Sequence, residues 1–127
     1  MNGSEASLFR LNASRLMAER QQTEKTLREH QRLLRGSLLE RPKFCGKPGC
    51  KCTKGQPHPP GLYLSRLVKG TVRQVFIRAA DHGRARKEAI SYKEYRQALR
   101  RWRAIEKELN KIWEALEAAQ EEEYPFG

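Results

Sequence analysis

The chain lacks an apolar run near the roughly 18 residues that a transmembrane helix needs, so the sequence predicts no membrane span. Its polar N-terminus has no signal-peptide pattern, and we expect a cytoplasmic protein. The motifs HExxH, GxSxG, GxGxxG and Walker A are missing, and Asp81 is the single aspartate. Nucleases and transposases that use bound metal ions need clustered carboxylates. We therefore expect no enzymatic activity.

Cysteine is scarce and confined to one place, since all three residues lie between positions 45 and 52. In the cytosol, thiols stay reduced and such a cluster more often binds metal than forms disulfides. A Pro-Gly turn separates the first two cysteines, and a histidine follows six residues after the last. Thiolates with an imidazole satisfy the tetrahedral preference of Zn²⁺. The sequence predicts a zinc site formed by Cys45, Cys50, Cys52 and His58. The alternatives are water, His82 or a second chain as the source of the fourth ligand, or thiols that bind nothing.

Positive charge is abundant and unevenly distributed along the chain, whose formal net charge is +11. Residues 41–90 carry twelve Lys and Arg against two Asp and Glu. Residues 1–40 carry seven against five, and residues 91–127 carry seven against eight. Concentrated positive charge favours a polyanionic partner, nucleic acid first and an anionic membrane second. Because no basic amphipathic helix with an aromatic face accompanies it, we expect no membrane partner.

Two long segments have the composition of helices. The first, residues 5–40, is rich in helix formers. We expect an end or a bend at Gly36, and Pro42 prevents the helix from continuing. The second, residues 79–123, starts with a short helix and then restarts or kinks at the capping box Ser91-Tyr-Lys-Glu94. Apolar residues there recur at alternating spacings of four and three, which indicates a helical interface. Its predicted members are Tyr95, Leu99, Trp102, Leu109, Trp113 and Leu116, and the stripe is widened by Ile105 and Ile112.

Residues 41–78 are predicted to form a basic module that holds the zinc site and a β-hairpin. Two β-branched and aromatic runs, 62–68 and 71–77, flank Lys69-Gly70. Lys-Gly is a poorer two-residue turn than Asn-Gly, so a three-residue turn with Gly70 in the left-handed region is an alternative. We expect a single, mainly α domain. Its two long helices form an antiparallel helical hairpin or coiled coil, with the zinc and β-hairpin head between them.

Basic side chains gather on this module. With a two-residue turn, Arg66 lies directly across from Arg73, and like charges in that position destabilise a strand pair. A phosphate between the two guanidinium groups would relieve the repulsion, since each can donate two parallel hydrogen bonds. The predicted nucleic-acid contacts are Lys43, Lys47, Lys51, Lys54, Arg66, Lys69, Arg73 and Arg78.

Four short motifs together resemble a family of short prokaryotic proteins of unknown function with an RGSL…CGKPxCxC…HGPYYYLS pattern. They are Arg35-Gly-Ser-Leu38, Cys-Gly-Lys-Pro-x-Cys-x-Cys, His58-Pro-Pro-Gly-Leu-Tyr-Leu-Ser65 and Val-Lys-Gly-Thr71. Members of that family often lie near transposase genes. The resemblance implies a metal role for the three cysteines, extends it to the histidine, and implies a mobile-element context. This chain differs from the pattern at Pro59 and Leu62.

The sequence thus predicts a small zinc-binding accessory protein that binds nucleic acid, DNA in preference to RNA, in a mobile-element or recombination system. A recombinase or transposase is the expected protein partner. The alternative is a coiled-coil assembly adaptor whose apolar seam bridges recombinase subunits or forms a homodimer. Salt separates the two hypotheses, because nucleic-acid binding weakens steeply with salt and an apolar helix interface resists it.

Overall fold

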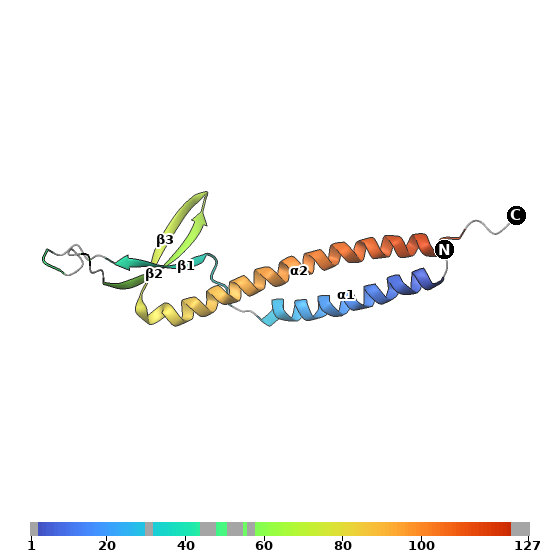
Figure 1. The fold of residues 1–127 in the computed structure, drawn as a ribbon, viewed down its shortest axis with the longest axis horizontal. Helices are drawn as coiled ribbons and strands as arrows, with labels where there is room; N and C mark the ends of the chain where they lie inside the picture. Colours follow the sequence, from blue (N-terminus) through green and yellow to red (C-terminus); the bar gives the residue numbers. More distant parts are fainter. Residues whose placement is uncertain (1–2, 30–31, 44–47, 51–54, 56–57, 123–127) are drawn as a thin grey trace. The chain divides into compact units, whose positions relative to one another are not determined.

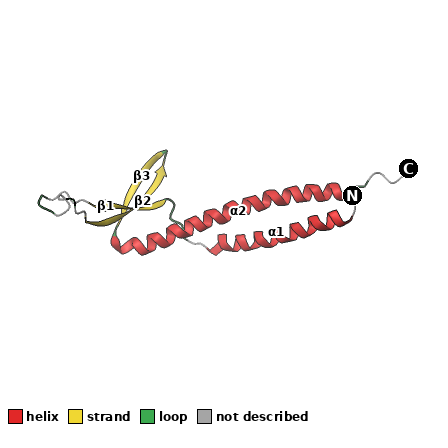
Figure 2. Cartoon of the chain, in the orientation of Figure 1, coloured by secondary structure: helices red, strands yellow, loops and turns green. Residues whose placement is uncertain are grey.

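The computed structural model describes residues 3–29, 32–43, 48–50, 55 and 58–122. Figures 1 and 2 show its elements, which in chain order are α1 (Gly3–Glu29), β1 (Ser37–Lys43), β2 (His58–Val68), β3 (Thr71–Ile77), the 3-10 helix η2 (Ala79–Asp81) and α2 (His82–Gln120). No helix in this described part of the chain is long and apolar enough to cross a membrane.

The chain divides into two compact units. Unit 1 comprises residues 1–31 and 95–127, and unit 2 comprises residues 32–94. The helix α2 contributes its first turns to unit 2 and the remainder to unit 1. The prediction of a mainly α fold is confirmed, and its β component is a sheet of three strands.

The N-terminal helix is shorter than predicted. Helix α1 ends at Glu29, so the prediction of helix was wrong for residues 37–40, which belong to β1. The physical reason lies at Gly36, whose φ of 129° no helical residue adopts. A Cβ atom at this position would lie 2.7 Å from the carbonyl oxygen of Ser65 and 2.9 Å from Cδ1 of Leu64. Only glycine therefore lets the chain approach β2 closely enough to continue as a paired strand.

Helix α2 is one uninterrupted helix of 39 residues. The predicted restart at Ser91 does not occur, because Ser91 and Glu94 lie in the helix interior. The residues after Gly83 include neither glycine nor proline up to the end of the helix, so nothing in the backbone forces a break there.

Apolar side chains from both helices form the core of unit 1. Ala13 and Leu16 of α1 cluster with Ile105 and Leu109 of α2, and Ile112 packs against them. Ile105 is 0% and Leu109 1% exposed. The predicted seam is therefore centred on these two residues. Its other predicted members lie at the edge, with Trp113 44% exposed and the remaining four half-buried: Tyr95, Leu99, Trp102 and Leu116.

Charged pairs flank this core, where α1 and α2 lie side by side in unit 1 (Figure 1). The guanidinium group of Arg101 donates hydrogen bonds of 2.5 and 3.0 Å to the two carboxylate oxygens of Glu19. Arg20 donates a 2.5 Å hydrogen bond to Glu106, the one polar interruption of the apolar stripe. Each pair joins α1 to α2, so the charge pattern reinforces the apolar contact.

The bond from Arg101 holds the pKa of Glu19 below its usual value of 4.5. A carboxyl group whose pKa is lower in the folded state stabilises that state fully when the pH is above its unfolded-state pKa. This stabilisation is lost as the pH falls through the lower, folded-state pKa. Unit 1 should thus unfold at lower urea concentration as the pH drops below about 4.5. Both tryptophans belong to unit 1, so their emission reports its unfolding. Glu19→Gln should make the urea midpoint of unit 1 depend less on pH. Glu114→Gln, at an exposed position of α2, should leave the pH dependence of that midpoint unchanged.

Unit 2 is built on an antiparallel sheet with strand order β1-β2-β3. The sequence prediction included the β2–β3 hairpin and missed β1. Pro42 is tolerated in β1 because this strand is an edge and its register shifts between Arg41 and Lys43. Pro59 and Pro60 occur in β2 before its pairing with β3 begins at Leu62, where they remove no hydrogen bond to β3.

The interior of unit 2 is small. Leu62 and Leu64 of β2 are 1% and 6% exposed, and Ala85 in the first turns of α2 is 6% exposed. A polar contact joins α2 to the neighbouring strand β1, since Arg86 of α2 donates a 2.8 Å hydrogen bond to Glu40 of β1. We call the side of the sheet that carries Glu40, Leu62 and Leu64 the packed face.

Candidate nucleic-acid interface

The tip of the β2–β3 hairpin is a two-residue turn. The register pairs Val68 with Thr71, which leaves Lys69 and Gly70 between the strands. Their φ angles are 50° and 80°, so both residues lie in the left-handed region that a type I′ turn requires. This turn confirms the first of the two predicted geometries over the three-residue alternative.

The same register places Arg66 directly opposite Arg73. Both side chains are exposed, and they share the packed-face side of their strands with Leu64 and Val75, two pairs nearer to the base of the hairpin. Opposed residues on neighbouring antiparallel strands have Cβ atoms about 5 Å apart. The tip therefore holds two cationic side chains on one side, with Lys69 in the turn between their strands.

Unit 2 carries the whole net charge of the protein. Residues 32–94 contain fifteen Lys and Arg against four Asp and Glu, which gives +11. Residues 1–31 and 95–127 contain eleven of each and are neutral together. The net positive charge that attracts a polyanion is thus carried by unit 2.

Arginines pair with Glu40, Asp81 and Glu88 of unit 2. Besides the Arg86–Glu40 bond, Arg78 lies 2.8 Å from Asp81, and Arg84 lies 3.1 Å from Glu88. The hydrogen bond to Asp81 raises the pKa of Arg78. Arg78 was a predicted nucleic-acid contact, but it follows Arg73 by five residues along an extended strand, a separation of about 17 Å. Among the predicted contacts whose side chains the structure describes, it brings together Arg66, Lys69 and Arg73.

Two of the four predicted zinc ligands lie outside the described residues. Cys45 and Cys52 fall there, as do three predicted nucleic-acid contacts, Lys47, Lys51 and Lys54. Cys50 is half-buried. The residues that the structure describes include no group of three or more His, Cys, Asp or Glu able to hold a metal ion, a finding that does not extend to Cys45 and Cys52.

The strands on either side fix where the cysteine segment begins and ends. Lys43, the last residue of β1, pairs with His58, the first residue of β2. Neighbouring strands lie about 4.8 Å apart, so the backbone brings His58 beside a residue only two positions before Cys45. The pairing of Lys43 with His58 therefore places the two ends of the intervening segment side by side.

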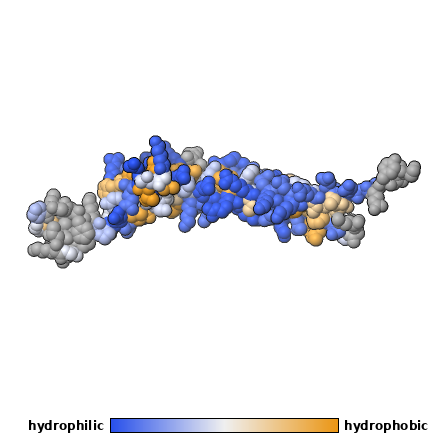
Figure 3. Space-filling model, turned by 90° about the horizontal axis from the view of Figure 1, so that it is seen from above, coloured by the Kyte–Doolittle hydropathy of each residue, from blue (hydrophilic) through white to orange (hydrophobic). Residues whose placement is uncertain are grey.

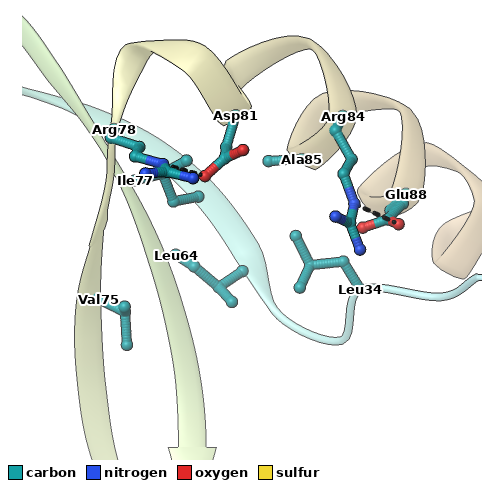
Figure 4. Close-up of a pocket in the computed structure, with 9 residues that line it drawn as sticks. All are labelled: Leu34, Leu64, Val75, Ile77, Arg78, Asp81, Arg84, Ala85 and Glu88. Atoms are coloured by element: carbon teal, nitrogen blue, oxygen red, sulfur yellow. Dashed lines mark hydrogen bonds and ion pairs between the residues drawn. The ribbon is translucent and has the colours of Figure 1, made fainter.

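A cavity of about 290 Å³ opens on the packed face of unit 2 (Figure 4). Its apolar lining comes from the sheet, from Ala85 and from Leu34, whose backbone N–H donates a 3.0 Å hydrogen bond to the carbonyl oxygen of Glu88. The Arg78–Asp81 and Arg84–Glu88 pairs complete the lining. These pairs satisfy one another's charges, so the cavity offers mainly apolar surface.

Asp81 and His82 are adjacent in the chain, where η2 meets α2. His82 begins α2, and its Nε2 lies 3.0 Å from the carbonyl oxygen of Ile77. Asp81 accepts the hydrogen bond from Arg78. Each side chain contacts a different partner at the junction of β3 and α2.

Sequence reasoning missed a group on the other side of the sheet: Arg41, Tyr63 and Phe76. The available signal was the alternation of Tyr63 and Phe76 with the apolar residues of the packed face. Without β1, that alternation described a two-stranded ribbon and gave no reason to expect a continuous face.

Comparison with curated proteins and with solved structures finds no match. A family model described as a domain of unknown function, DUF6788, matches residues 16–87. The match runs from α1 through all three strands into α2 and covers 72 of the 127 residues, more than half. It fits the expected resemblance to an uncharacterised family. The chain therefore belongs to the DUF6788 family of domains of unknown function.

Proposed function

We propose that the protein is a small zinc-binding accessory protein that binds nucleic acid through unit 2, DNA in preference to RNA, in a mobile-element or recombination system. The observation that carries the proposal is the opposition of Arg66 and Arg73 at the hairpin tip. The confinement of the +11 charge to unit 2 supports it. The mobile-element context follows from the resemblance of the sequence motifs.

The chemistry of the tip favours phosphate. Two guanidinium groups on opposed residues repel each other, and an anion between them removes that repulsion while it accepts their hydrogen bonds. Lys69 adds a third cation within the same turn. A nucleic-acid backbone supplies phosphates at regular spacing, so further lysines of the basic module contact neighbouring groups.

We assign zinc to Cys45, Cys50, Cys52 and His58, where it would tie the segment between β1 and β2 to the sheet. The closed pair Lys43–His58 supports this assignment because it anchors both ends of the segment. Zinc supplies no reaction here. Its role is to hold lysines of that segment, Lys47, Lys51 and Lys54, in a fixed arrangement for phosphate contacts.

The two helices of unit 1 form an antiparallel helical hairpin in this proposal. The contacts support that direction, because the earlier residues of α1 meet the later residues of α2. Glu19 and Arg20 contact Arg101 and Glu106, respectively. The core residues Ala13 and Leu16 cluster with Ile105 and Leu109, and Ile112 packs against them.

A second candidate function is assembly, with unit 1 as an adaptor that joins recombinase subunits or a second copy of the chain. Apolar residues on the outside of unit 1 favour it, since Leu8 is 55% and Leu11 67% exposed. Figure 3 shows an apolar patch at the end of unit 1 where α1 begins, on an otherwise largely hydrophilic surface. Such contacts would persist at high salt.

The test is the salt dependence of DNA binding by Arg66→Ala with Arg73→Ala. Loss of two phosphate contacts should weaken binding to all duplex sequences and reduce the slope of log affinity against log salt by about two. Fluorescence anisotropy with labelled DNA and RNA duplexes measures affinity, slope and preference together.

Arg10→Ala with Arg28→Ala is the matched control, because it removes the same charge from exposed positions of α1. It should leave the slope unchanged. Equal losses in the two double variants would show that binding follows total charge and does not involve the hairpin tip. A parent protein that binds neither duplex, and instead self-associates at high salt, would favour the adaptor.

A further inference from the structure

The sheet of unit 2 has a second face, opposite to the packed face. Side chains alternate between the faces along each strand, and the register therefore assigns six residues that matter here to one side: Arg41, Tyr63, Leu67, Val72, Gln74 and Phe76. We call this side the open face. Its apolar members remain accessible, with Leu67 61%, Val72 64% and Phe76 49% exposed. Figure 3 shows apolar side chains among hydrophilic ones over the sheet.

Two aromatic rings lie next to each other on the open face. Tyr63 pairs directly with Phe76, and their ring centroids are 5.5 Å apart at an interplanar angle of 63°. Beside them, Gly61 is buried, and a Cβ atom there would lie 3.1 Å from the Tyr63 ring and 3.3 Å from the Phe76 ring. Glycine thus leaves room for both rings to lie close to the strands.

An arginine completes the cluster. The guanidinium carbon of Arg41 lies 5.8 Å from the centroid of the Tyr63 ring, within the range of a cation–π contact. The same group donates a hydrogen bond to the side-chain oxygen of Gln74. Arg41 is exposed, so its remaining N–H groups can still meet an anion.

The charges of the sheet select the kind of occupant. Glu40 is the only acidic residue in the three strands, and it lies on the packed face, where it pairs with Arg86. Among the six open-face residues named above, Arg41 is the charged one, whereas Arg66 and Arg73 belong to the packed-face side. An occupant that matches the open face is therefore anionic and also presents flat apolar rings. Single-stranded nucleic acid has both properties, whereas a duplex keeps its base faces stacked inside.

We propose that the open face binds single-stranded nucleic acid, with bases stacked on Phe76 and Tyr63 and a phosphate contacted by Arg41. This inference rests on the proposed function and adds that unit 2 recognises single-stranded nucleic acid. The hairpin tip and the open face then belong to one basic sheet, the first meeting the backbone and the second the bases.

The experiment compares single-stranded and duplex binding of the full-length chain. Labelled oligothymidine, oligouridine and a DNA duplex serve as probes in fluorescence anisotropy. Phe76→Ala should weaken binding to both single strands about tenfold, the usual effect of removing one stacking ring. It should leave duplex binding unchanged. The probe that the parent binds more tightly identifies DNA or RNA as the preferred source of the strand.

Two further variants separate stacking from packing. Phe76→Tyr keeps a ring and should bind single strands like the parent, whereas Phe76→Leu keeps apolar bulk without a ring and should lose affinity like Phe76→Ala. Val72→Ala, at a more exposed position of the open face, should have no effect. Parent-like binding by Phe76→Leu would overturn the inference.

The outcomes also separate this inference from the function on which it rests. If Phe76→Ala binds single strands like the parent while Arg66→Ala with Arg73→Ala loses affinity, the open face is not the site and the proposed function stands. If the parent binds no nucleic acid of any kind, both fail together.

Discussion

Leu109→Asp is expected to lower the free energy of unfolding of unit 1 by about 3–5 kcal/mol, the usual cost of an uncompensated charge in a core. Leu109 is 1% exposed and clusters with Ala13, Leu16 and Ile105. A carboxylate there would lose its hydration, and none of its core neighbours can donate a hydrogen bond from a side chain. Urea unfolding followed by tryptophan emission measures the loss in unit 1 directly.

Leu11→Asp is the control, since it places the same charge on the same helix pair at a position that is 67% exposed. It should shift the urea midpoint little. Equal midpoints for Leu109→Asp and the parent would contradict the described core. A loss of the same size in Leu11→Asp would point instead to a covered outer face of α1, as the adaptor hypothesis requires.

Removal of zinc is expected to have the second large effect, confined to unit 2. Metal binding contributes folding free energy where the ligands are, of the order of 10 kcal/mol in small zinc domains. The purified chain should hold about one Zn²⁺, as a closed four-ligand site requires. Chelation should then increase amide hydrogen exchange in β1 and β2, while the tryptophan emission of unit 1 remains native.

Single substitutions identify the ligands. Cys50→Ser should lose zinc and reproduce the effect of chelation, and His58→Ala should do so if the imidazole is the fourth ligand. Full zinc affinity in His58→Ala would transfer that role to water, a second chain or His82, whose Nε2 already lies beside the carbonyl oxygen of Ile77. A zinc-free chain with unchanged exchange and melting would rule out the structural metal site.

The sequence predicted those elements whose signals are local. Helix α2 lacks glycine and proline after Gly83, and its apolar spacing identified the seam that contains Leu109. The hairpin followed from two β-forming runs around Lys69-Gly70. The turn type was left open because Lys-Gly suits two loop lengths, and the register that decides between them depends on pairing along both strands.

β1 could not be predicted in the same way. Its residues, Leu38-Leu39-Glu40-Arg41, are good helix formers, and they become a strand only because β2 offers an edge for them. The open face was missed for the same reason, since Arg41 approaches Tyr63 only once β1 is paired. The zinc ligands were suggested by composition and spacing, and their arrangement remains a prediction.

The backbone conformation of Lys69 affects which substitutions stabilise the hairpin. Its φ of 50° lies in the left-handed region, which costs a residue with a side chain like lysine roughly 1 kcal/mol. Asparagine, the favoured residue at this turn position, would make the hairpin more stable and remove the outermost positive charge. Local stability and polyanion affinity therefore compete at this single position.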